Sequence, residues 1–339
     1  MEGVMRPERN LNRRVMSWCL AAAFAVVPMA SNAANEGAAN ALQDAVGEYA
    51  YDKTPEKLSA IRNLLDKGAM PDIQTVFLAS YYKAPEALDL LLAKAPQLVN
   101  EPVQGNGETL LLSALNNVQG PAVSPDEERI IDRLIKAGAN VNVIAQGGTQ
   151  TPLIAAASGG SRAFPHPDLV QKLLHAGADP KLTTPNGFTV LTGNGATNLE
   201  VIKLLIAAGA DPFAVSAVGS TPLHFVCTRT AYEMSGKPDP QASQRIALLL
   251  KPGASIDATY PQKRPFPVKT PLGEAATSAN PDCVKALLDA GAKKTALAFA
   301  DSYVAADPSV KGKTVQQIVL SSAKKYPSLY SPEIVKLFE

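Results

Sequence analysis

One short phrase recurs through the chain and constrains its fold more than any other feature. A Leu-Leu or Leu-Ile pair is followed by two variable residues and then by Gly-Ala. The copies begin at Leu64, Leu134, Leu173, Leu205, Leu249 and Leu287, and a weaker copy without the glycine begins at Leu91. Glycine after an apolar pair is typical of a helix C-terminus, where it adopts a left-handed conformation at no steric cost. A helix end that repeats in this way predicts a stack of similar helical units.

A second phrase precedes the first and predicts where helices begin. It starts at Thr75, Thr109, Thr151, Thr189, Thr221, Thr270 and Thr314. Three copies have the sequence Thr-Pro-Leu, and one of them continues to His224 as Thr-Pro-Leu-His. Threonine caps helix N-termini and proline is tolerated in the first turn, so each copy indicates a helix start. Apolar residues between the phrases have helical spacing, as at Val201, Leu204 and Leu205.

The two phrases together resemble the ankyrin repeat, which has a period of about 33 residues and the signature T-P-L-H-x-A. The resemblance extends from about residue 38 to the C-terminus. It implies an all-α ankyrin-repeat solenoid of about eight helix-pair units with projecting turn fingers. We use "finger" for the turn that links one unit to the next. The resemblance places a repeat domain at residues 34–339, with degenerate capping units at about 38–72 and 312–339.

Departures from the period predict insertions. The threonines that begin successive copies of the second phrase are 32 residues apart at the shortest interval and 49 at the longest. The excess lies between the two helices of a unit, in the Gly-, Pro- and Ser-rich segments 117–126, 158–167 and 229–241. We expect these loops to share one edge of the stack. A long finger from Tyr260 to Pro267 contains three prolines, an arginine and two aromatic residues. It is either an interface anchor or an ordinary solvated loop.

The N-terminus has the pattern of a secretory signal peptide. Four arginines lie in the first 14 residues, an apolar run occupies residues 15–30, and small residues follow at Ser31 and Ala33. The run has 16 residues, whereas a helix that spans a bilayer needs about 20. We therefore expect cleavage after about Ala33 and a bacterial periplasmic location, with no membrane span after cleavage. An uncleaved anchor and full secretion are the alternatives.

Composition argues against several kinds of chemistry. Residues 34–339 contain 28 basic and 29 acidic side chains, and this balance argues against a nucleic-acid partner. The three histidines show no metal-ligand spacing, and we predict no metal, no cofactor and no enzymatic activity. The resemblance gives His224 a structural hydrogen-bonding role. Gly193-Asn194-Gly195 is interpreted as a loosened first helix. Cys227 and Cys283 either form a disulfide or remain buried free thiols, and the sequence leaves both open.

The architecture of the family implies protein binding through finger tips and the concave face. Tyr82, Gln146, Phe188, Phe225, Tyr260, Arg264 and Phe266 fall at such positions, with packing inside the stack as the alternative for each. The leading hypothesis is a non-enzymatic periplasmic module, monomeric when unbound, that binds one protein partner. That partner is either an effector toxin, which makes the chain an immunity protein, or a periplasmic enzyme such as a catalase. A secreted effector that binds host proteins is a further alternative.

Overall fold

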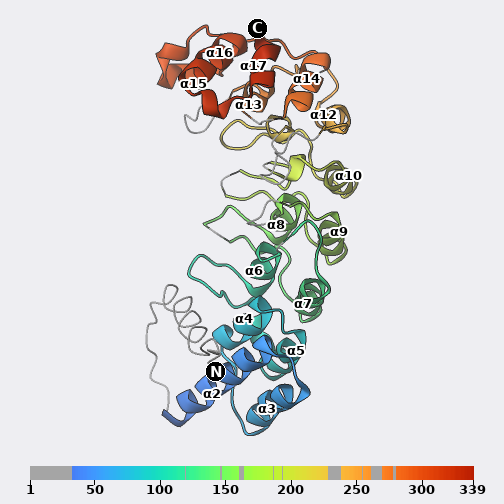
Figure 1. The fold of residues 1–339 in the computed structure, drawn as a ribbon, viewed down its shortest axis with the longest axis vertical. Helices are drawn as coiled ribbons and strands as arrows, with labels where there is room; N and C mark the ends of the chain where they lie inside the picture. The colour runs from blue at the N-terminus through green and yellow to red at the C-terminus, as the bar shows by residue number, and fades with distance from the viewer. Residues whose placement is uncertain are drawn as a thin grey trace, which may run out of the picture.

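The computed structural model describes residues 33–339, apart from residues 119, 146, 160–163, 186, 193, 228–237, 254, 261–268 and 278–279. Helices stack in two columns and form a single elongated array from one terminus to the other (Figure 1). Within the described residues the β-structure is limited to isolated bridges between single residues. The expectation of an all-α solenoid is confirmed.

The first column contains the helix that begins each unit, and neighbours along it are in contact. Its members are α2 (Ala33–Tyr51), α4 (Ile73–Tyr81), α6 (Leu110–Asn116), α8 (Pro152–Ser158), the short η3 (Asn194–Ala196), α11 (Pro222–Phe225), α13 (Pro271–Ala275) and α16 (Val315–Lys325).

The second column contains the partner helix of each unit, so the described residues form eight pairs. Its members are α3 (Pro55–Asp66), α5 (Pro85–Lys94), α7 (Pro125–Lys136), α9 (Pro167–His175), α10 (Leu199–Ala207), α12 (Ala242–Leu249), α14 (Pro281–Asp289) and α17 (Pro332–Phe338). Among the described residues, four short helices lie outside the pairs. They are η1 (Pro96–Asn100), α15 (Asp301–Ala306), η4 (Pro308–Val310) and η5 (Pro327–Leu329).

Backbone hydrogen bonds explain the constant spacing of the leucine and glycine phrase. After α10, the Gly209 N–H donates to the Ile206 carbonyl and the Ala210 N–H donates to the Leu205 carbonyl, both at 2.9 Å. Gly209 has a φ of 100°, which a side chain would oppose. This is the Schellman arrangement, and it requires two residues between the apolar pair and glycine. The copies that begin at Leu64, Leu134, Leu173 and Leu287 make the same two bonds.

Some helix boundaries depart from the phrases for local reasons. Helix α12 ends at Leu249, the first leucine of its copy, because Pro252 disfavours helical backbone at the residue before it. The prediction that Thr75 begins a helix is wrong. Helix α4 begins at Ile73, and the Asp72 carboxylate caps it by accepting the Thr75 N–H at 2.8 Å. Asp72 is a better N-cap residue than threonine, so the helix begins earlier.

The fifth unit has only the single turn η3 in place of its first helix, and this turn begins five residues after Thr189. The prediction that Thr189 begins a helix is therefore wrong, whereas the Gly-Asn-Gly sequence predicts the loosened first helix that is observed. Within this turn, a Cβ added to Gly195 would lie 2.1 Å from the Val190 carbonyl oxygen, so a larger residue does not fit. The turn still occupies its place in the first column, between α8 and α11.

The apolar core is one continuous cluster that follows the whole stack, from Leu42 in α2 to Phe338 in α17. Leucine, valine and alanine supply most of it, which explains how a chain with few aromatic residues buries enough surface. In the part of the chain that the structure describes, no helix has the length and apolar character of a membrane span.

We expect Leu205→Ala to lower the free energy of unfolding by about 2–5 kcal/mol, because Leu205 in α10 is fully buried and its truncation leaves a cavity. Urea unfolding followed by circular dichroism measures the loss. The half-buried neighbour Leu204, changed to alanine, is the control and should lose less. A loss below about 0.5 kcal/mol for Leu205→Ala would contradict its interface position.

Candidate functional site

Five of the fingers share one backbone design, in which a hydrogen bond closes the base of the finger. In the finger that follows the second unit, the Val103 N–H donates to the Glu108 carbonyl at 2.7 Å. The equivalent donors in four later fingers are Ala145, Thr184, Ser216 and Ala298, with donor–acceptor distances of 2.8–3.0 Å. All five donor residues are buried, so each finger stands on a base anchored in the stack.

The residue before each of these donors is exposed. We call these five positions the finger row, and they are Pro102, Ile144, Thr183, Val215 and Leu297. Ile144 is 36% exposed, Val215 44% and Leu297 59%, all unusual values for large apolar side chains. Because the units stack one on the next, equivalent positions on successive fingers lie in a row along the array (Figure 1). A row of apolar side chains on rigid turns is suited to contact with another macromolecule.

The structure places four of the seven residues singled out from the sequence. Tyr82 is 40% exposed and follows α4, at the turn between the two helices of the second unit. Phe188 is half-buried, and its carbonyl accepts the hydrogen bond that closes its finger. Phe225 and Tyr260 are half-buried, and Phe225 packs against the core. Gln146, Arg264 and Phe266 lie outside the described residues.

The finger row was not singled out from the sequence, although a signal for it exists. Aligning the units on the residue that donates across each finger shows that the preceding residue is apolar in four of five cases. That alignment requires the closing hydrogen bonds, which have no fixed distance from the leucine or threonine phrases. The exposed apolar position is therefore visible only once the finger geometry is known.

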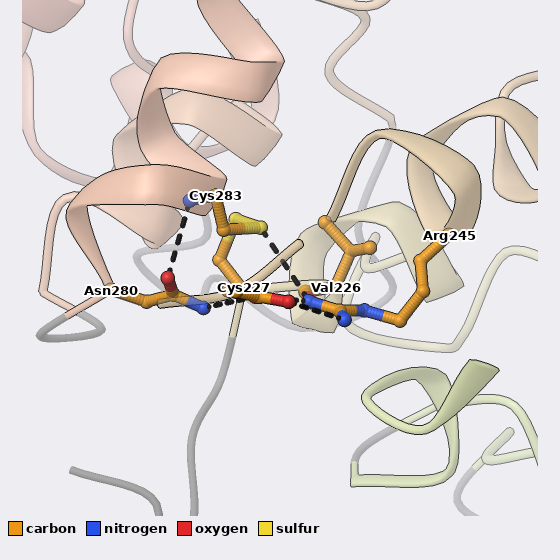
Figure 2. Close-up of a disulfide and its surroundings, with 6 residues drawn as sticks. Val226, Cys227, Arg245, Asn280 and Cys283 are labelled. Atoms are coloured by element: carbon orange, nitrogen blue, oxygen red, sulfur yellow. Dashed lines mark hydrogen bonds and ion pairs between the residues drawn. A yellow bond between two sulfur atoms is a disulfide. The ribbon is translucent and has the colours of Figure 1, made fainter. Parts of the chain in front are cut away.

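A disulfide joins Cys227 after α11 to Cys283 in α14, with their Cα atoms 5.5 Å apart (Figure 2). The pairing left open by the sequence is thus present in the structure. It links the sixth unit to the seventh and bridges 56 positions of sequence. Both cysteines are buried.

A buried ion pair lies beside the disulfide. The Arg245 guanidinium in α12 binds the Asp239 carboxylate through two parallel hydrogen bonds of 2.9 and 2.6 Å. The guanidinium also donates to the Val226 carbonyl at 3.3 Å (Figure 2). Asn280 donates to the same carboxylate at 2.7 Å and accepts the Cys283 N–H at 3.2 Å. Cys227, just before the predicted insertion at 229–241, and Asp239, near the end of that insertion, are therefore both tied to the seventh unit.

His224 has the structural role that the resemblance implies. Its Nδ1 accepts the Thr221 backbone N–H at 3.0 Å and closes a capping box at the start of α11. Burial lowers the pKa of His224 to about 4. The imidazole is therefore neutral at neutral pH, and protonation would break the cap because Nδ1 would lose its lone pair.

We expect His224 to make the fold sensitive to acid. Its pKa is lower in the folded state than its ordinary value of 6.5, so its stabilising contribution is complete above pH 6.5 and is lost as pH falls toward 4. The loss amounts to about 3 kcal/mol. The measurement is the free energy of unfolding between pH 7 and pH 4, compared with His224→Gln, which keeps a side-chain cap that does not titrate. Identical pH slopes in the two proteins would contradict this role.

Acidic, histidine and cysteine side chains do not gather into a metal-binding group anywhere in the described residues. The burial of His166 lowers its pKa, so this second buried histidine is also neutral at physiological pH. The surface features described above offer hydrogen bonding and apolar contact.

Comparison with known proteins agrees with this geometry. Residues 150–185 match the family model of the ankyrin repeat. The chain is 31% identical over 145 residues to the nuclear factor NF-kappa-B p105 subunit of Gallus gallus, which covers 41% of this chain and 13% of that protein. It is 32% identical over 99 residues to a putative ankyrin repeat-containing protein of Treponema pallidum (strain Nichols), which covers 29% and 32% of the two chains. The chain thus spans a third or less of each of these relatives.

The fold also matches a solved structure, the human ASB11 ankyrin repeat domain. The TM-score is 0.50 at 22% sequence identity, over 78% of this chain and 97% of that one. Residues 150–185 thus match an ankyrin repeat, and the stacked helix pairs have the fold of an ankyrin-repeat domain.

Proposed function

We propose that the chain is a periplasmic protein-binding module that holds a folded protein partner against its fingers and concave face. The observation that supports this most is the finger row, in which equivalent exposed positions carry Pro102, Ile144, Val215 and Leu297. Repeat solenoids use extended surfaces of this kind for binding.

The rigidity of the fingers favours binding. Each of the five fingers that carry the finger row is closed by a backbone hydrogen bond and stands on a buried residue, so little conformational entropy is lost when a partner docks. Burying an exposed isoleucine, valine or leucine side chain contributes about 1.5–3 kcal/mol. Several such contacts along one row are sufficient for specific recognition without a strong net charge.

Two features support the periplasmic location. The N-terminal 33 residues have the pattern of an export signal, and the disulfide between Cys227 and Cys283 suits an oxidising compartment. We expect cell fractionation to recover the protein in the periplasm with an N-terminus at about Ala34. A cytosolic protein that keeps residues 1–33 would contradict the location.

The binding surface is tested by changing two members of the finger row. We expect Ile144→Asp with Val215→Asp to weaken partner binding at least tenfold, because two carboxylates would have to be desolvated at the interface. The matched control is Ile144→Thr with Val215→Thr, since Thr183 shows that threonine occupies this position naturally. Partners captured from periplasmic extract are identified with the unaltered chain, and their affinities for the variants are then measured by calorimetry.

Equal binding by the aspartate variant would remove the finger row from the interface. The identity of the captured protein also separates the partner classes. A toxin encoded beside this gene would make the chain an immunity protein, whereas a catalase or another periplasmic enzyme would make it a helper of that enzyme.

A further inference from the structure

Three exposed tyrosines lie at the inter-helix turns of the first two units. Tyr51 ends α2 and is 75% exposed, Tyr81 ends α4 and is 43% exposed, and Tyr82 follows it at 40%. Tyr51 and Tyr81 each lie four residues before the proline that begins the second helix of their unit. They are therefore equivalent positions on neighbouring helices, because α2 contacts α4. We call the three residues the tyrosine edge.

Two of the three rings of this edge, those of Tyr81 and Tyr82, are held in place before any partner arrives. Tyr81 contacts Phe77 with ring centroids 5.4 Å apart, and Tyr82 meets Tyr81 edge to face at 5.2 Å. Asn117 of the third unit donates to the Tyr81 carbonyl at 3.0 Å, which fixes the turn from the other side. A pre-formed aromatic surface loses little side-chain entropy when a ligand packs on it.

Negative charge lies beside Tyr51. Asp44 lies four residues before Glu48 and Glu48 three residues before Tyr51, so the three exposed residues share one face of α2. Two lysines near these turns are engaged in ion pairs, since Lys53 binds Asp126 at 2.6 Å and Lys83 binds Glu127 at 2.7 Å. Residues 34–180 carry 17 acidic and 11 basic side chains, so the surrounding half of the array is also acidic.

We propose that the tyrosine edge binds a cationic, arginine-rich segment of a protein partner. Arginine combines positive charge with a planar guanidinium that stacks on aromatic rings, so it matches both properties of this surface. The site is separate from the finger row, because fingers precede the first helices and these turns follow them. In the second unit the nine residues of α4, about 13 Å of helix, separate the two surfaces.

The test uses a fluorescein-labelled octa-arginine peptide and the full chain, with binding measured by fluorescence anisotropy. We expect saturable binding that weakens with salt, and an affinity for octa-arginine above that for octa-lysine. Tyr51→Ala with Tyr82→Ala should lower the affinity about 5- to 30-fold, the loss of two cation–π contacts. Tyr51→Phe with Tyr82→Phe should keep it, because the rings remain. Asp44→Asn with Glu48→Gln should lower affinity and flatten the salt dependence.

The eighth unit offers a matched control. Tyr326 is 49% exposed and follows α16, at the turn between the two helices of its unit, where the Lys325 ammonium lies 5.1 Å from its ring. Tyr326→Ala should leave octa-arginine binding unchanged. The finger-row variant Ile144→Asp with Val215→Asp should also leave it unchanged, so failure of the proposed function can be distinguished from failure of this proposal. Unchanged affinity of the Tyr51 and Tyr82 double alanine variant, an equal loss in Tyr326→Ala, or equal binding of octa-glutamate would overturn the proposal. Thermal unfolding confirms that each variant is folded.

Discussion

Replacing Cys227 and Cys283 with alanine should lower the free energy of unfolding by about 4 kcal/mol, the chain-entropy value for a loop of 56 residues. The loss should be local. In a repeat array each unit is stabilised mainly by its neighbours, so removing a link between the sixth and seventh units weakens the C-terminal part of the stack.

Hydrogen exchange measures where the stability is lost. Amides of α12 and α14 should exchange faster in the double alanine variant, whereas amides of α5 and α7 should be unaffected. Reduction of the unaltered protein by dithiothreitol should reproduce the same pattern. Unchanged exchange in α12 and α14, or faster exchange throughout the array, would contradict a stabilising effect of the disulfide that is confined to the neighbouring units.

Changing Asp239 to asparagine should destabilise the same region by about 3–5 kcal/mol, because it leaves the Arg245 guanidinium buried without its counter-charge. Arg245 is only 5% exposed, so water cannot replace the carboxylate without opening the packing around α12. Asparagine has nearly the same shape as aspartate, so the loss reports charge rather than volume. Urea unfolding followed by circular dichroism gives the magnitude.

A double variant separates the ion pair from the effect of a buried, unpaired charge. Asp239→Asn with Arg245→Met should recover part of the lost stability, since methionine fills space and carries no charge. The exposed pair of Lys285 and Asp289, both 65% exposed, is the control, and Asp289→Asn should change stability by less than about 1 kcal/mol. Similar losses at the buried and the exposed pair would show that burial does not govern the interaction.

Much of the fold is predictable because its signals are local. The left-handed Gly209 and the hydrogen bonds to Leu205 and Ile206 involve only six consecutive residues, so the sequence phrase is sufficient to specify the helix end. The wrong prediction of a helix start at Thr75 also has a local cause. The capping aspartate lies three residues earlier, and the repeated threonine suggested a register that this unit does not keep.

The candidate surfaces were less predictable because they depend on equivalent positions in different units. Ile144 and Val215 belong to one row only because their fingers close in the same way, and Tyr51 and Tyr81 belong to one edge only because α2 and α4 stack in register. Insertions of different length separate such positions by irregular intervals in the sequence. A motif search at a fixed period therefore misses them.

The sequence by itself determined a stack of helix pairs, the C-termini of most second helices, the N-termini of most first helices and the loosening of one first helix near Gly195. Those features follow from hydrogen bonding and sterics within a few residues. Only the tertiary structure decided that Cys227 forms a disulfide with Cys283 and that Asp239 forms an ion pair with Arg245. It also decided which apolar side chains stay exposed to solvent. These contacts depend on how one unit packs on the next, and that register is set by the summed packing of whole helix faces.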